Sequence, residues 1–174
     1  MQTLIDKSGS VSGLRDLLER AESLPRAAGI IVLAADGNEF TPKEIDPLLA
    51  DSPLPLIGGV FPQIMWGNQR MERGTIVASV PVAPRIVTVP GLSDPSARYA
   101  PILEGSLEPG AGSTMIAFVD GLATRISGLI EAMFDVYGLE LNYIGGGAGS
   151  LSLKQQPCVM TRDGLVADTA VLAQ

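Results

Sequence analysis

Two Asp-Gly pairs are the groups in this chain with the clearest potential for ligand chemistry. Asp36-Gly37 and Asp120-Gly121 each follow an apolar run typical of a strand that is buried on both faces. In open α/β sheets, ligands commonly bind where such strands end. For either Asp alone, a turn or a helix cap is the commoner role. The recurrence of the pair in both halves of the chain favours a ligand site modestly.

A glycine-rich run at residues 145–150 is the second candidate. It predicts a sharp turn, or a ligand contact through bare backbone N–H groups. A phosphate-binding Walker loop is not indicated, because the next Lys is Lys154. The alternating residues 151–153 do not predict the helix that opens a dinucleotide site. The structural role is slightly favoured, and both roles are compatible.

Other reactive side chains offer little. The chain contains no His, which excludes Ser-His and Cys-His nucleophiles and His-ligated metals or haem. Cys158 follows Pro157 without a neighbouring base, which indicates an inert, partly buried thiol. Arg125 could meet an anionic ligand, although a solvated surface Arg is commoner. We therefore predict no catalytic residue, no metal site and no cofactor.

Length and composition narrow the class of protein. The 174 residues, 46% of them hydrophobic, predict one domain over residues 1–174. The net charge of −7 comes without a Lys/Arg cluster, which argues against nucleic acid as a partner. One Cys, no apolar leader and no apolar run of about 20 residues argue against export and membrane insertion. We expect a cytoplasmic protein.

The elements that must position these residues are repeated. Within residues 28–90, an apolar run ends on Asp-Gly and is followed by a helix, a strand ending on two glycines and a β-branched run. The same order recurs within residues 113–172, where Tyr-Ile-Gly-Gly at 143–146 parallels Leu-Ile-Gly-Gly at 56–59. We predict an α/β fold in which two similar β-α-β-β halves form one layered domain with mixed sheets.

Local patterns predict the remaining elements. Residues 12–23 have the spacing of an amphipathic helix. Residues 75–80 and 85–89 read as an antiparallel pair joined by a Pro-bounded turn, and 90–112 as a connector.

In the second half, residues 139–144 read as a strand entering the glycine turn. Asp163-Gly164 is a strong hairpin signal between residues 159–162 and 166–172.

Several of these motifs resemble the FIST N-terminal domain family, and the resemblance spans nearly the whole chain. It implies a sensory domain of signalling proteins that binds a small ligand such as an amino acid, usually followed by a FIST C-terminal domain. Haem binding, suggested for some relatives through His, is not expected here. The motifs are Phe-Val-Asp-Gly at 118–121, Tyr-Ile-Gly-Gly-Gly-Ala-Gly at 143–149, Met-Thr-Arg-Asp-Gly-Leu-Val at 160–166, Leu-Ile-Gly-Gly at 56–59 and the opening strand at 30–35.

We therefore predict a non-catalytic intracellular sensory domain with a small-molecule ligand. Two alternatives stay open: a small enzyme that uses the glycine-rich loop and Asp120, and a structural module that docks a partner domain. A FIST C-terminal domain, a signalling partner and a second copy of the chain are the protein partners considered. The residues predicted to face one ligand-binding cleft are Gly58, Gly59, Asp120, Gly121, Arg125, Gly145, Gly146, Gly147 and Gly149.

Overall fold

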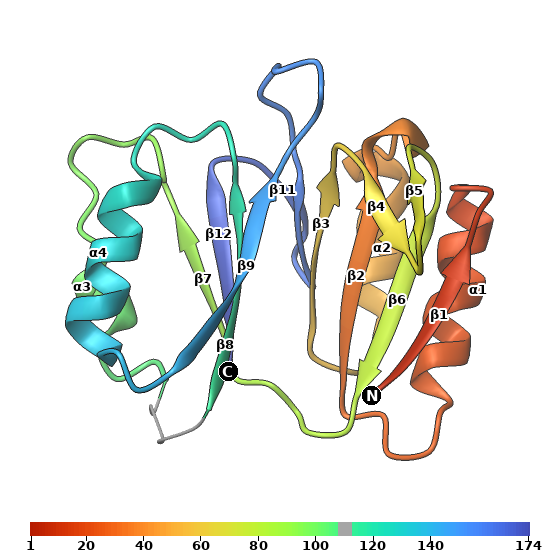
Figure 1. Ribbon diagram of the computed structural model, residues 1–174, viewed down its shortest axis with the longest axis horizontal. Helices are drawn as coiled ribbons and strands as arrows, with labels where there is room; N and C mark the ends of the chain where they lie inside the picture. Colours follow the sequence, from red (N-terminus) through yellow and green to blue (C-terminus); the bar gives the residue numbers. More distant parts are fainter. Residues whose placement is uncertain (108–112) are drawn as a thin grey trace.

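A computed structural model describes residues 1–107 and 113–174 as four layers, with two β-sheets between two outer layers of helices (Figure 1). The larger sheet has the order β1 (Gln2–Asp6), β6 (Thr75–Val80), β2 (Gly29–Ala35), β3 (Leu56–Phe61), β10 (Val159–Thr161), β11 (Gly164–Val166). The smaller has the order β7 (Ile86–Pro90), β12 (Thr169–Ala173), β8 (Thr114–Asp120), β9 (Asn142–Ala148). The predicted α/β class with mixed sheets is confirmed.

Helices cover the outer face of each sheet. α1 (Val11–Glu22) and α2 (Pro42–Asp51) lie on the larger sheet, and α3 (Ala100–Leu103) and α4 (Ile126–Tyr137) on the smaller (Figure 1). A 3₁₀ turn, η1 (Asp36–Asn38), follows β2, and β4 (Ile64–Trp66) pairs with β5 (Gln69–Met71) in a separate hairpin. Within the described part of the chain, no helix is long and apolar enough to span a membrane.

Local sequence explains where the first helices begin. Ser10 caps α1 by accepting a hydrogen bond from the Gly13 N–H at 3.0 Å. Thr41 and Glu44 form a capping box at the start of α2. Pro47 lies inside α2, which continues past it to Asp51.

Strand alternation explains the layers. In β2, Ile30 and Val32 pack among the buried side chains of α1 and α2, while Ile31 and Leu33 line a cavity shared with β8 and β9. Both faces of the strand are therefore apolar, as its unbroken hydrophobic run predicts.

The two sheets contain strand sets of the same order. β1-β6-β2-β3 matches β7-β12-β8-β9, and each set has one parallel pair, β2 with β3 and β8 with β9. The other pairs in both sets are antiparallel. This arrangement is compatible with two similar halves, and their superposition stays a prediction.

Two local predictions are wrong, the β6–β7 hairpin and the glycine turn. β6 and β7 form no hairpin, because the Pro-rich residues 81–84 carry the chain from one sheet to the other, where β7 pairs with β12. The hairpin predicted at Asp163-Gly164 is confirmed, because β10 pairs antiparallel with β11 there. Its predicted second strand, 166–172, is divided, since β12 pairs with β8 in the smaller sheet. The glycines at 145–147 lie within strand β9 instead of forming a turn. Part of the predicted connector, residues 108–112, lies outside the described residues.

Candidate functional site

The glycines of β9 allow two close backbone approaches. A Cβ on Gly145, whose φ is +156°, would lie 1.8 Å from the Ala117 carbonyl oxygen of β8. A Cβ on Gly147 would lie 3.2 Å from the Cα of Gly121, whose N–H donates to the Ala148 oxygen at 2.8 Å. The Asp120-Gly121 corner and the glycine run are therefore neighbours, as the predicted cleft requires. The contact between them is backbone packing.

The Asp120 side chain is buried and does not point to solvent at the Asp120-Gly121 corner. The side chain is 1% exposed and lies at the end of β8. One carboxylate oxygen accepts the Leu122 N–H at 3.0 Å. The other accepts the Asp168 N–H at 2.7 Å and the Gln155 side-chain amide at 3.3 Å. Protein donors thus already satisfy both oxygens, so Asp120 has a structural role here.

Cys158 lies against the same carboxylate. The pKa of this fully buried thiol is raised to about 12, mainly by burial and additionally by the negative charge of Asp120 and a hydrogen bond to it. The thiol is therefore protonated at neutral pH. An uncharged thiol is a poor nucleophile, in agreement with the inert role predicted from the sequence.

Arg125 belongs to a different contact. Its guanidinium donates to the carbonyl oxygens of Asp94 at 2.6 Å and Ala97 at 2.9 Å, and lies 5.4 Å from the centre of the Tyr99 ring. These bonds fix the segment before α3 against the start of α4. The structure therefore does not bring Arg125 together with the glycines of β9.

Asp36, the first-half counterpart of Asp120, holds the loop after β9. Its carboxylate accepts the Ser150 hydroxyl at 2.6 Å and the Gln156 side-chain amide at 3.1 Å. Gln155 of the same loop donates to Asp120. The two Asp residues that sequence analysis singled out thus fix one loop between the sheets. Sequence alone could not have revealed these partners, which lie more than 100 residues from Asp36.

The glycines of β3 and the last glycine of the run mediate contacts between strands. A Cβ on Gly58 would lie 2.4 Å from the Val32 oxygen, and one on Gly59 would lie 3.2 Å from the Ala148 side chain of β9. The Gly149 N–H donates to the Val60 oxygen at 2.8 Å. Gly59 and Gly149 therefore lie where the two sheets meet, whereas Gly58 packs against β2 within the larger sheet.

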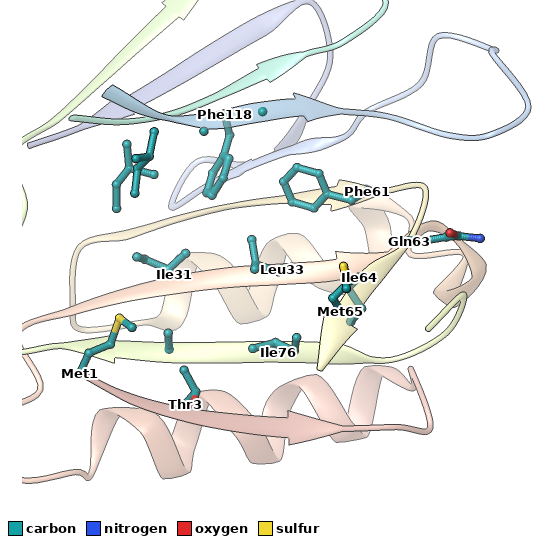
Figure 2. A pocket seen from close by; sticks show the side chains of 15 residues that line it. Met1, Thr3, Ile31, Leu33, Phe61, Gln63, Ile64, Met65, Ile76 and Phe118 are labelled. Atoms are coloured by element: carbon teal, nitrogen blue, oxygen red, sulfur yellow. The ribbon is translucent and has the colours of Figure 1, made fainter. Parts of the chain in front are cut away.

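A cavity of about 570 Å³ lies between the sheets (Figure 2). Phe61 and Phe118 form one wall, with their rings edge to face at 5.4 Å. Of the predicted site residues, Gly145 and Gly146 line it. Sequence analysis did not predict the aliphatic residues of its lining, whose only signal was the apolar character of both faces of β2. The aliphatic lining comes from Ile31, Leu33, Ile64, Ile76, Ala78, Ile116 and Ile144.

A second hollow, of about 480 Å³, lies between α4 and β9. Gly121, Gly145, Gly146 and Gly147 line it together with apolar side chains of α4. The glycine strand β9 therefore has an apolar hollow on each face, and most of the predicted glycines border one or both.

Comparison with known proteins identifies the family. No group of three or more His, Cys, Asp or Glu side chains in the described residues could hold a metal ion. Neither the curated proteins nor the solved structures contain a match to this chain. The family model of the FIST N domain matches residues 30–173, which include nearly every element described above. The chain therefore belongs to the FIST N domain family, which is assigned to sensory signal transduction.

Proposed function

We propose that this domain senses a small ligand that binds in the cavity between the two sheets. The observation that carries the proposal is that the cavity walls come from both sheets, β2, β3 and β6 on one side and β8 and β9 on the other. A ligand that contacts both sheets would stabilise one spacing between them over others. Such a change in spacing is a signal that a neighbouring protein can detect.

The cavity lining indicates the chemistry of the ligand. The lining side chains are mostly aliphatic or aromatic, and the side-chain polar groups are those of Thr3 and Gln63. The Gln63 amide already donates to Glu72 at 3.0 Å. A free amino acid would lose hydration from its ammonium and carboxylate groups with few partners to replace it. We therefore propose a ligand with an apolar body and at most one polar end.

The alternative of a small enzyme has less support. Asp120 is engaged by backbone and side-chain donors, and the buried Cys158 thiol is protonated at neutral pH. Neither group borders the cavity between the sheets. We place the sensory function in the cytoplasm, where the single thiol of the chain would remain reduced.

A thermal-shift screen with apolar metabolites, including fatty acids and aromatic acids, tests the proposal. A ligand at 100 times its dissociation constant adds about 2.7 kcal/mol to the free energy of unfolding. Trp66, the only Trp, follows the cavity residues Ile64 and Met65, so its fluorescence provides a second readout.

A cavity-filling variant with a matched control locates the binding. Ala78→Leu adds a side chain inside the cavity, whereas Thr88→Leu adds one at an exposed position of β7. We expect binding to weaken by about tenfold or more in the first variant only, because the added group occupies ligand volume. Equal affinity in both variants, or no stabilising compound in the screen, would contradict the proposed site.

A further inference from the structure

Strand β9 ends the smaller sheet with an unpaired edge. In the sheet order it pairs with β8 on one side, and no strand of the described residues pairs with the other. The Asn142 N–H donates towards β8, to Ser113, and the Ala148 oxygen accepts from Gly121. Along a parallel strand, the N–H and C=O groups of successive residues point alternately to one side and the other. The amide groups of Tyr143, Gly145 and Gly147 therefore face the free edge.

The larger sheet shows what occupies the matching position. There the strand set β1-β6-β2-β3 continues with β10 and β11, whereas the set β7-β12-β8-β9 ends at β9. β10 pairs antiparallel with β3 at its glycines, with Met160 opposite Gly58 and Val159 opposite Gly59. The Val60 N–H donates to the Cys158 oxygen at 2.7 Å. A β-hairpin therefore completes the edge of the larger sheet.

The glycine pair that receives β10 has a counterpart in β9. Leu-Ile-Gly-Gly at 56–59 aligns with Tyr-Ile-Gly-Gly at 143–146, which places Gly58 opposite Gly145 in the alignment. Gly58 pairs with β10, while Gly145 has its amide group at the free edge. The edge of β3 is thus paired with β10, whereas the corresponding edge of β9 pairs with no strand of the described residues.

The open edge lacks the Lys and Pro residues that protect many exposed edges. Natural edge strands are commonly shielded by Lys, by Pro or by a bulge. Residues 126–153 contain no Lys, Arg or Pro. Ile144 on the strand is 55% exposed, and Ile130 and Phe134 of the neighbouring helix are 44% and 39% exposed. Since an apolar hollow lies on each face of β9, an added strand would bury side chains on both faces.

Charge distinguishes between occupants. The charged residues within 126–153 are Glu131, Asp135 and Glu140, all exposed and all acidic. Pairing of β9 with β9 of a second copy would bring two acidic rims together, which disfavours a homodimer. A partner with basic residues beside its strand would be attracted instead.

We propose that the free edge of β9 binds an antiparallel β-strand or hairpin of a different protein or domain, apolar on both faces and flanked by Lys or Arg. This is strand addition, in which backbone hydrogen bonds supply affinity and the hollows select side chains. The strand would replace, on the smaller sheet, what β10 and β11 supply on the larger.

A peptide that copies the internal hairpin tests the proposal. The probe comprises residues 157–167, with Ser in place of Cys158 and with Lys added at both ends. We expect it to slow hydrogen exchange of the Tyr143, Gly145 and Gly147 amides. Ile144→Lys should weaken binding about tenfold or more, because it places a charge on the edge strand. Val82→Lys, at an exposed apolar residue outside this edge, should leave binding unchanged.

Three results would overturn the proposal. The first is no binding of the peptide up to about 1 mM, which is the weak limit of specific recognition. The second is binding that protects no β9 amide or that Ile144→Lys leaves unchanged. The third is self-association of the protein that Ile144→Lys abolishes, since the occupant would then be a second copy. Circular dichroism of both variants verifies that they remain folded.

Discussion

Replacing Asp120 by Ala should destabilise the protein far more than replacing Asp36. The substitution leaves the N–H groups of Leu122 and Asp168 without acceptors in a partly buried position. A buried donor without a partner costs about 1–3 kcal/mol. Removing the carboxylate also removes the free energy that its burial costs, which offsets part of this loss. We therefore expect the free energy of unfolding to fall by about 2–4 kcal/mol.

The matched substitution Asp36→Ala should cost about 1 kcal/mol or less, because its hydrogen-bond partners are side chains that can turn to water. Ser150 also bonds to the Ser152 hydroxyl at 2.9 Å, and Gln156 is exposed. In a domain of this size each kcal/mol shifts the melting temperature by about 2–4 °C. Asp120→Ala should therefore melt about 4–16 °C lower than the parent protein.

Urea unfolding followed by Trp66 fluorescence and by circular dichroism measures both losses. The reasoning fails if Asp120→Ala is as stable as Asp36→Ala, or if it retains full stability while losing affinity for a ligand. The latter result would return Asp120 to the ligand-binding role predicted from the sequence.

Three other predictions follow from the same contacts. Gly145→Ala should unfold the protein or lower its melting temperature strongly, because the added Cβ would overlap the Ala117 oxygen. Gly146→Ala is the matched control: its added Cβ would have no atom within 4 Å, so the variant should melt nearly as the parent protein does. Native Cys158 should not react with a thiol reagent at pH 8, and should react once urea unfolds the chain, because burial raises its pKa to about 12. The thiol ionises near pH 9 in the unfolded chain, so its contribution to the free energy of unfolding should be complete below pH 9 and lost as the pH rises towards 12. The free energy of unfolding of Cys158→Ala should fall less over that range. Arg125→Ala should lower the melting temperature by a few degrees, about 1–2 kcal/mol, and should leave ligand affinity unchanged because the guanidinium contacts two carbonyl groups away from the cavity.

Periodicity was sufficient to predict the class of fold. The apolar runs of β2 and β8, the helices after them and the existence of the glycine-containing strands β3 and β9 all follow from local pattern. The positions at which β3 and β9 end do not, because both strands continue past their glycines. Pairing between distant strands could not be predicted in the same way. Residues 81–84 read as a hairpin turn, and only the pairing of β7 with β12 shows that the chain crosses between sheets there.

The candidate site shows the same limit. Asp120 ends its strand as predicted, but the direction of its side chain depends on which sheet lies opposite, and sequence did not predict that packing. The apolar residues of the cavity, such as Leu33 and Ile76, are equally consistent with an ordinary core. A cavity arises only where two apolar faces diverge, which is a property of tertiary packing and not of any single strand.

The position of the cavity follows from how the two sheets overlap. β10 contacts β12 and β8, and β3 contacts β9, so β2, β6 and β1 extend beyond the free edge of β9. Their apolar residues Ile31, Ile76 and Ala78 therefore line the cavity at a place where the smaller sheet has no strand to cover them. A strand added to β9 would lie across this region, so the ligand and the partner strand would contact the same surface. Binding of one should consequently change the affinity for the other by the same factor in both directions, which titrating the peptide with and without a cavity ligand would measure.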